Sequence, residues 1–284
     1  MLETVLTIGQ ALAQGARLLE EAAVPSARLT AEILLCHALR KERPHLFSHG
    51  TDPLTELAWL HYGRYLHQRL QGEPVQYITK RQEFYGRLFR VGPAVLIPRP
   101  ETEHVIEVAL ECAPRARRAV DIGCGSGAIG VTWALERPGC AVWASDISEA
   151  AVRVARENAD ALGAVARFAV CDLGAAFGPE GCFDLVLSNP PYIPQPEGPA
   201  LQREIREHEP HVALFGGPTG VEIYERLIAD ARRLLAPGGW LIMEIGYQGE
   251  GRVRAMLDPV DWDRAGTRLD LAGWPRVVAA QRRG

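Results

Sequence analysis

The chain has 284 residues and a mass of 31.1 kDa, enough for one large α/β domain and a smaller accessory domain. Hydrophobic residues make up 47% and charged residues 23%, a globular balance that argues against a disordered chain. A net charge of −4 provides no basic field for non-specific nucleic-acid binding. Met1–Thr4 carry an early acid and no basic stretch, and no apolar run is long enough for a membrane span, so we expect a cytoplasmic protein.

The cysteines and histidines give no sign of a metal site. The six cysteines are scattered, and no pair has the Cys-x-x-Cys spacing of zinc or thioredoxin-like motifs. His208 and His211 are three residues apart, but Pro210 between them disrupts a helical ligand pair. We therefore expect no metal.

The first 73 residues are expected to form a helical domain. In the first segment, apolar residues recur on one helical face at Val5, Ile8, Leu12 and Leu19. A second helix is predicted from Leu29 to Cys36. Asp52 followed by Pro53 predicts the start of a third helix, which runs to about Leu70.

Residues 74–98 differ in composition from the helical segment and are predicted to form a β-hairpin that links two domains. Aromatic and β-branched residues from Val75 onward are separated by the turn residues Gly86 and Gly92. The prolines and acids of residues 98–103 then introduce another helix, which is expected to end near Cys112.

Strand and helix patterns alternate through residues 99–284. Apolar runs predict strands at residues 119–122, 141–144, 167–170, 183–188 and 240–245. A helical stripe covers residues 221–235, and residues 262–282 are expected to close the domain with a pair of strands. This alternation predicts a parallel sheet covered by helices on both faces.

A glycine-rich loop, residues 121–127, lies between a predicted strand and a predicted helix. Glycines there allow a ligand to approach the backbone near the helix N-terminus, although a structural turn or a nicotinamide site has a similar pattern. Asp146 ends the next strand, where it could bind ribose hydroxyls or cap a helix. Asp172 follows the third strand, where it could accept from an adenine amino group or act as a turn residue.

The sequence Asn189-Pro190-Pro191-Tyr192 follows the fourth predicted strand. The two prolines donate no backbone hydrogen bonds and fix φ, so the chain leaves the sheet stiffly. This leaves the Asn189 side chain and the Pro190 carbonyl at the edge where open α/β sheets bind ligands. Neutral acceptors beside an aromatic ring suit a planar NH2 group, such as an amide or an exocyclic amine.

Together these motifs resemble those of class I S-adenosylmethionine-dependent methyltransferases that modify amino nitrogens. Residues 74–79, 83–86 and 96–103 further resemble the HemK/PrmC family, whose members methylate a glutamine N5 of class 1 peptide chain release factors. The likeness extends along nearly the whole chain, including Glu209-Pro210 and Ala272-Gly273. It implies a Rossmann-like methyltransferase domain with a small N-terminal helical domain and a β-hairpin connector.

The resemblance also implies roles for individual residues. S-adenosylmethionine would be held by Gly123, Cys124, Gly125, Ser126, Gly127, Asp146, Asp172, Leu173 and Asn189, with Arg99, Glu101 and Thr102 closing over it. The substrate glutamine would be held by Asn189, Pro190, Pro191 and Tyr192, of which Asn189, Pro190 and Tyr192 are the candidate catalytic residues. Cys124 and Leu173 depart from the family pattern, which often has threonine and an aromatic residue there.

The expected activity is methylation of the glutamine in the Gly-Gly-Gln motif of release factors by a monomer, with S-adenosylhomocysteine as the product. An adenine-N6 DNA methyltransferase or a ribosomal-protein glutamine methyltransferase would use a similar pocket. The acidic pI of about 6.1 disfavours stable nucleic-acid binding. A non-catalytic nucleotide-binding module or a nicotinamide dehydrogenase would explain the glycine-rich loop but not residues 189–192.

Overall fold

The computed structural model describes residues 6–178 and 181–284. Met1–Thr4, on which the expectation of a cytoplasmic protein partly rests, and Val5 of the first helical stripe lie outside the described residues. By its internal contacts the chain divides into two units, Met1–Lys80 with Arg203–His208, and Arg81–Gln202 with Glu209–Gly284.

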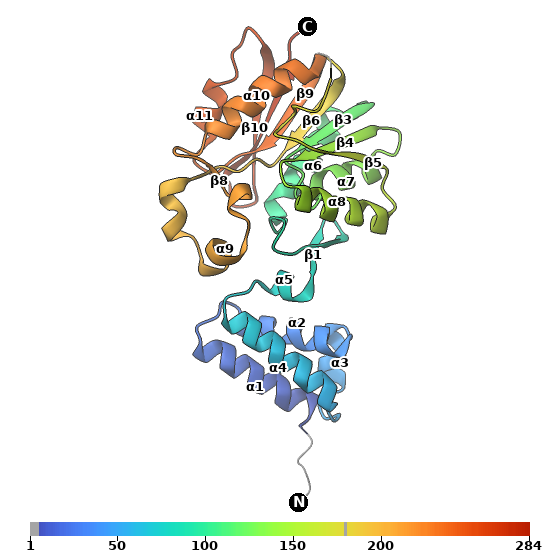
Figure 1. Ribbon diagram of the computed structural model, residues 1–284, viewed down its shortest axis with the longest axis vertical. Helices are drawn as coiled ribbons and strands as arrows, with labels where there is room; N and C mark the ends of the chain where they lie inside the picture. Colours follow the sequence, from blue (N-terminus) through green and yellow to red (C-terminus); the bar gives the residue numbers. More distant parts are fainter. Residues whose placement is uncertain (1–5, 179–180) are drawn as a thin grey trace, which may run out of the picture. The chain divides into compact units, whose positions relative to one another are not determined.

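The first unit is helical (Figure 1). Its helices are α1 (Ile8–Glu21), α2 (Ala27–Leu39), α3 (Arg43–Ser48), α4 (Glu56–Leu70), α5 (Val75–Thr79) and α9 (Arg203–His208). Leu19, Leu34 and Tyr62 are fully buried in its core. Arg69, whose side chain is 8% exposed, forms an ion pair of 2.8 Å with Glu204, which links α4 to α9.

Two predictions for this region are wrong. Helix α4 begins at Glu56 because Thr55 is its cap and accepts a hydrogen bond from the backbone N–H of Ala58. Pro53 instead lies in an isolated antiparallel bridge with Thr7. Residues 75–79 were expected to be extended but form α5, which ends at a left-handed Lys80.

The second unit is built on a seven-stranded sheet (Figure 1). Its strands are β3 (Arg118–Ile122), β4 (Ala141–Asp146), β5 (Ala166–Val170), β6 (Phe183–Ser188), β9 (Leu235–Glu244), β10 (Trp262–Leu269) and β11 (Pro275–Arg282). The order is β10-β11-β9-β6-β3-β4-β5. Strands β9, β6, β3, β4 and β5 are parallel, as expected, and β11 and β10 extend the sheet in antiparallel fashion.

Helices cover both faces of this sheet (Figure 1). They are α6 (Glu103–Cys112), α7 (Ala128–Glu136) and α8 (Glu149–Leu162) on one face, and α10 (Glu222–Leu234) and α11 (Glu250–Ala255) on the other. Neighbouring residues of each strand enter different cores: Ala119 packs with α6 and α7, whereas Val120 packs with α10. The alternation follows from the two-residue period of a strand. Both faces being buried explains the continuous apolar runs in the sequence.

The remaining elements are short. They are β1 (Arg81–Phe84), β2 (Arg87–Arg90), β7 (Ile193–Pro194), β8 (Phe215–Gly217) and the 3-10 segments η1 (Pro100–Thr102), η2 (Gln195–Ala200) and η3 (His211–Ala213). Strands β1 and β2 form the predicted hairpin. Asn158 of α8 joins the end of this hairpin to the loop that precedes α7, because its side chain accepts from Arg90 N (2.7 Å) and donates to Arg90 O (3.0 Å) and Ser126 O (2.8 Å).

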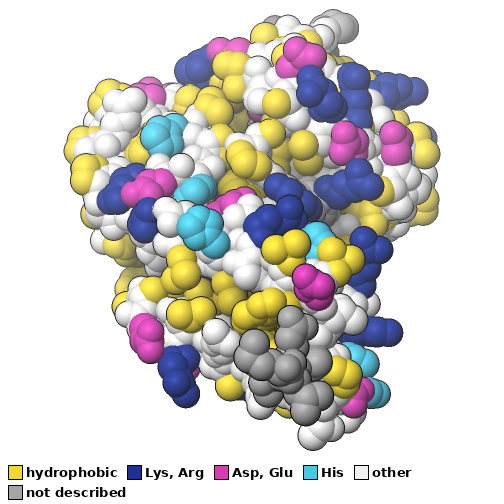
Figure 2. All heavy atoms as spheres, turned by 60° about the horizontal axis from the view of Figure 1, so that its bottom comes forward, with side chains coloured by type: hydrophobic (Ala, Val, Ile, Leu, Met, Phe, Trp, Pro, Cys, Tyr) yellow, Lys and Arg dark blue, Asp and Glu magenta, His cyan; other side chains and the backbone are white. Residues whose placement is uncertain are grey.

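The surface carries mixed charge. On the face drawn in Figure 2, Lys and Arg side chains are interspersed with Asp, Glu and apolar side chains. Among the helices of the described chain, none combines the length and the apolar character that a membrane crossing requires.

Asn158→Ala tests the attachment of the hairpin. Asn158 is 1% exposed, and its removal leaves three backbone groups without their partner. We expect the free energy of unfolding to fall by about 2–4 kcal/mol, measured by urea denaturation. Glu157→Ala is the control, because the ion pair of Glu157 with Arg90 is exposed; an equal loss in both variants would contradict the assignment.

Candidate active site

The glycine-rich loop after β3 is held by its neighbour in the sheet. The backbone N–H groups of Gly123 and Cys124 both donate to the carbonyl of Ser145 at the end of β4, at 2.8 Å each. The N–H of Gly125 donates to Oδ2 of Asp146 at 2.9 Å. The loop is therefore fixed from one side, and its other side lines a cavity.

Two glycines are required where the loop enters α7. Gly127 caps the helix with φ of 82°, and a Cβ there would lie 3.0 Å from Val131. Gly130 donates its N–H to Oδ2 of Asp121 at 2.8 Å, and a Cβ at Gly130 would lie 3.0 Å from that carboxyl oxygen. The backbone of α7 at Gly130 thus lies in direct contact with the Asp121 side chain of β3.

Of the two acids beneath the loop, Asp121 is buried and Asp146 is half-buried. Burial raises the pKa of Asp121 to about 7, an effect that the Gly130 N–H opposes and the nearby Asp146 increases. The pKa of Asp146 is also raised, chiefly by burial, despite its backbone hydrogen bonds. Burial raises the pKa of the Cys124 thiol well above its usual value, so this cysteine stays a neutral, unreactive side chain.

Asp146 ends β4 and turns toward the loop. Its Oδ1 accepts from Ser148 N at 2.9 Å while Oδ2 accepts from Gly125 N. The helix cap of α8 is Ser148, whose hydroxyl accepts from Ala151 N at 3.2 Å. Ser148 therefore caps α8, whereas Asp146 links the turn between β4 and α8 to the glycine-rich loop.

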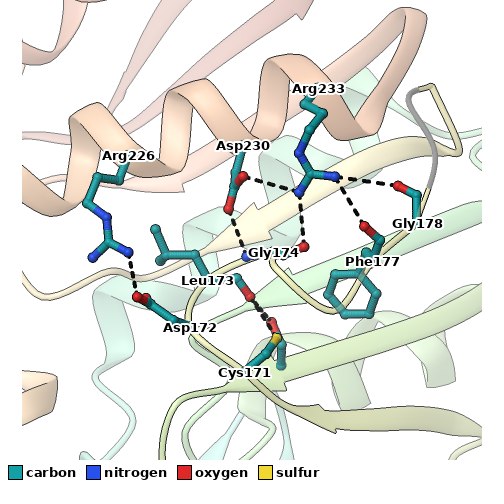
Figure 3. Close-up of polar contacts among 10 residues, drawn as sticks. Cys171, Asp172, Leu173, Gly174, Phe177, Gly178, Arg226, Asp230 and Arg233 are labelled. Carbon is teal, nitrogen blue, oxygen red and sulfur yellow. Dashed lines mark hydrogen bonds and ion pairs between the residues drawn. The ribbon is translucent and has the colours of Figure 1, made fainter.

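Asp172 and Leu173 form another wall of the cavity, close to α10. Figure 3 shows Arg226 of α10 pointing to Asp172, with which it forms an ion pair of 2.5 Å. Both side chains are about half exposed, so the pair contributes little to stability. Leu173 has φ of 46°, and its carbonyl accepts from Ser145 Oγ at 2.9 Å.

Helix α10 also holds the segment that follows. Asp230 accepts from Gly174 N at 2.9 Å, and the guanidinium of Arg233 donates to the carbonyls of Gly174 and Phe177 at 3.0 and 3.1 Å (Figure 3). The unusual backbone of Leu173 is therefore supported on both sides by side chains of a rigid helix.

Asn189 follows β6 and belongs to a chain of polar contacts. Its Nδ2 donates to Oγ1 of Thr102 at 3.1 Å, and the Thr102 hydroxyl donates to Glu244 at 2.5 Å. The Tyr192 hydroxyl donates to the other oxygen of Glu244 at 3.3 Å. Burial raises the pKa of Glu244 to about 7. Burial, with Glu244 nearby, also raises the pKa of Tyr192, which stays a neutral phenol.

These elements enclose a cavity of about 210 Å³. The predicted site residues that line it are Thr102, Gly123, Cys124, Gly125, Ser126, Asp146, Asp172, Leu173, Asn189 and Pro191. The lining residues that were not predicted as site residues are Leu96, Pro98, Ala128, Ile129, Ile147, Val212, Ala213, Ile223 and Arg226.

Five predicted residues lie outside this lining: Arg99, Glu101, Gly127, Pro190 and Tyr192. Arg99 pairs with the buried Glu209, which also accepts from Ile97 N at 3.1 Å, and Glu101 is exposed. Tyr192 was expected to offer a flat face to a ligand, but its hydroxyl points to Glu244. Its ring lies against Gly246, where a Cβ would be 3.1 Å away.

Arg226 and Glu244 were not among the residues predicted for the site. The signal for Glu244 was a carboxylate inside the apolar run of residues 240–245, which a buried strand tolerates only with partners. No sequence pattern distinguishes Arg226, because charged residues are common on helices. Its position beside Asp172 follows only from the tertiary structure. Within the described residues, no group of three or more His, Cys, Asp or Glu is placed to hold a metal ion.

Comparisons with known proteins agree in both parts of the chain. Residues 10–79 match the family "PrmC N-terminal domain" and residues 103–208 the family "Methyltransferase small domain". A release factor glutamine methyltransferase of Koribacter versatilis (strain Ellin345) is 45% identical, over 98% of this chain and 99% of its own length. One from Nitratidesulfovibrio vulgaris is 40% identical over 93% and 91%. A methyltransferase structure from Pyrococcus furiosus superposes with a TM-score of 0.53 at 19% identity, over 78% of this chain and all of that one, which shows the fold.

Asp121→Asn tests the buried acid through the pH dependence of stability. The folded pKa of Asp121, about 7, lies above its usual value of 3.8, so its contribution to stability is complete below the lower value and is lost as pH rises through the higher one. The variant lacks this titration. We expect its stability relative to wild type to rise by about 2 kcal/mol between pH 5 and pH 8. A constant difference, measured by denaturant unfolding at each pH, would show that Asp121 titrates normally.

Proposed function

Because the chain belongs to the family of release factor glutamine methyltransferases, we propose that it methylates the glutamine of the Gly-Gly-Gln motif in class 1 peptide chain release factors. The methyl group goes from S-adenosylmethionine to the side-chain amide nitrogen, N5, and S-adenosylhomocysteine is the other product. The observation that carries this proposal is the 45% identity to a relative of that name along nearly the full length of both chains. The protein would act as a cytoplasmic monomer without stable nucleic-acid binding.

The residues around the cavity fit the cofactor, which supplies an activated methyl group on a sulfonium. The backbone of residues 123–127 would hold its methionine part. Asp146 would bind the ribose: each carboxylate oxygen already accepts one backbone N–H and has a second lone pair for a hydroxyl. Asp172 would accept from the adenine amino group, while Leu173 and Ile223 give the ring an apolar contact.

Asn189 and Pro190 would bind the substrate amide. An amide nitrogen is a poor nucleophile because its lone pair is delocalised into the carbonyl. When the N–C bond forms and the S–C bond breaks, positive charge grows on the nitrogen, and its hydrogens become stronger donors. The Asn189 side-chain oxygen and the Pro190 carbonyl would accept them and stabilise the charge where it develops. One proton then leaves to solvent, so a dedicated base is unnecessary.

Two other methyl acceptors would use a similar pocket. A DNA adenine presents an exocyclic amine, but the net charge of −4 and the mixed charge on the face in Figure 2 offer little attraction for a phosphate backbone. A glutamine of a ribosomal protein has the same chemistry as the proposed substrate. The distinction from that activity therefore rests on the relatives and on experiment.

The decisive experiment measures methyl transfer from labelled S-adenosylmethionine to purified class 1 release factors. We expect label on a factor with intact Gly-Gly-Gln and none on its Gln→Ala variant. Ribosomal proteins and adenine-containing DNA are tested in parallel. Label on either of these and none on the release factors would reject the proposal.

Asn189→Ala removes one acceptor of the substrate amide. We expect kcat to fall by about 10²–10³, because the acceptor acts mainly in the transition state. Circular dichroism should show that the variant keeps its fold. The control is Gln281→Ala, which removes an amide side chain on β11 outside the cavity lining. Near-normal turnover of Asn189→Ala would place the substrate elsewhere.

Asp146→Asn tests the ribose position. An asparagine has one acceptor oxygen where Asp146 uses two, so one of the N–H groups of Gly125 and Ser148 loses its partner. We expect binding of S-adenosylmethionine, measured by calorimetry, to weaken by about tenfold to a hundredfold. Asp160→Asn at the exposed end of α8 is the matched control, and equal affinities for the two variants would contradict the assignment.

A further inference from the structure

The side chain of Asn189 has two chemically opposite ends. Its oxygen accepts hydrogen bonds, whereas its NH2 group donates them. A substrate amide that is methylated on nitrogen must meet the oxygen, because its own NH2 has only hydrogens to offer. Neighbouring groups of the protein must therefore fix the orientation of the Asn189 amide relative to the cavity.

The hydrogen bonds of Thr102 determine which end of the Asn189 amide faces the cavity. A hydroxyl has one hydrogen, and an ionised carboxylate can only accept. The Thr102 hydrogen therefore goes to Glu244 at 2.5 Å, which leaves a hydroxyl lone pair toward Asn189. Only the NH2 end of Asn189 can satisfy that lone pair, at 3.1 Å. Thr102 and Glu244 are 3% and 1% exposed, so water does not compete for these bonds.

We propose that Thr102 and Glu244 are positioning residues that set the direction of the Asn189 amide, so that its oxygen faces the cavity and selects a glutamine NH2 as the methyl acceptor. The proposal deepens and rests on the proposed function, because it names how the same site recognises its substrate. Neither residue needs to take part in the bond changes. Their effect reaches the substrate only through Asn189.

The charge of Glu244 determines whether the chain of hydrogen bonds keeps its direction. Arg276 on β11 favours the ionised carboxyl, and Glu101 of η1 opposes it. The Tyr192 hydroxyl donates to it, while the Tyr224 hydroxyl donates to the Glu244 backbone carbonyl at 3.3 Å. Once protonated, Glu244 can donate to Thr102, whose hydrogen is then free to bind the oxygen of Asn189. The amide would rotate and turn its NH2 toward the cavity.

The first test needs neither substrate nor cofactor. The carboxyl carbon of Glu244 and the side-chain NH2 of Asn189 are followed by NMR from pH 5 to pH 9. We expect the Asn189 signal to shift with the same midpoint as the Glu244 carbon in wild type, and to be constant in Glu244→Gln and in Thr102→Val. An Asn189 signal that ignores the titration of Glu244, or that still follows it in Thr102→Val, would overturn the proposal.

The second test uses the reaction. Thr102→Val keeps the shape of the side chain but removes the hydroxyl, whereas Thr102→Ser restores it. We expect kcat to fall by about 10²-fold in the valine variant, while the serine variant stays within about threefold of wild type. Wild type should bind a Gly-Gly-Gln factor more tightly than its Gly-Gly-Glu variant, and Thr102→Val should lose this preference. A merely structural role would leave the preference unchanged.

The pH profile separates Glu244 from other groups. We expect wild-type kcat to fall by about tenfold from pH 8 to pH 6 as the carboxyl is protonated. Glu244→Gln should give a flat profile, because its amide does not titrate; its oxygen can accept from Thr102 if its NH2 donates to the Tyr192 oxygen instead. An unchanged acidic limb in this variant would overturn the role of Glu244.

The outcomes distinguish the two proposals. If wild type labels no release factor, the proposed function fails, and the NMR measurement still judges the direction of the amide. If wild type labels the factor and Thr102→Val keeps full rate and preference, only the present inference fails.

Discussion

The site depends on backbone N–H groups that the protein itself holds in place. The carbonyl of Ser145 accepts from two successive loop amides, and the carboxylates of Asp146 and Asp121 accept from Gly125 and Gly130. Every one of these acceptors stands at the end of a parallel strand. The loop therefore takes its shape from the sheet before any ligand arrives, and little ordering is left for binding.

The sheet topology explains why the remaining groups meet the loop. From β3 the chain proceeds to β4 and β5 on one side, whereas β6 and β9 lie on the other. The carboxyl ends of parallel strands share one edge, and ligands bind in open α/β sheets where the strand order reverses. Asn189 after β6 is thus placed across from the glycine-rich loop after β3, and Glu244 at the end of β9 lies behind it.

The sequence pattern predicted those features that neighbouring residues in the chain determine. The strand positions, the loop and Asn189 could be located because buried parallel strands give apolar runs that end in glycine, acid or proline residues. Contacts between segments that are distant in the chain produced no recognisable pattern in the sequence. Thr55 rather than Asp52 caps α4 because Pro53 pairs with Thr7, and Arg226 reaches Asp172 only because α10 lies against the segment that follows β5. Tyr192 looked like a ligand platform, yet its hydroxyl is engaged by a carboxyl 52 residues away.

The helical unit is discontinuous along the chain. Its buried Arg69 pairs with Glu204, which follows after more than a hundred residues of the other unit have intervened. During synthesis the first helices leave the ribosome long before that carboxylate exists. A nascent chain, or a fragment that ends at Lys80, must then keep a guanidinium without its counter-charge, which favours a looser α4 until the later segment arrives. Folding of this unit is therefore coupled to completion of the unit that follows it.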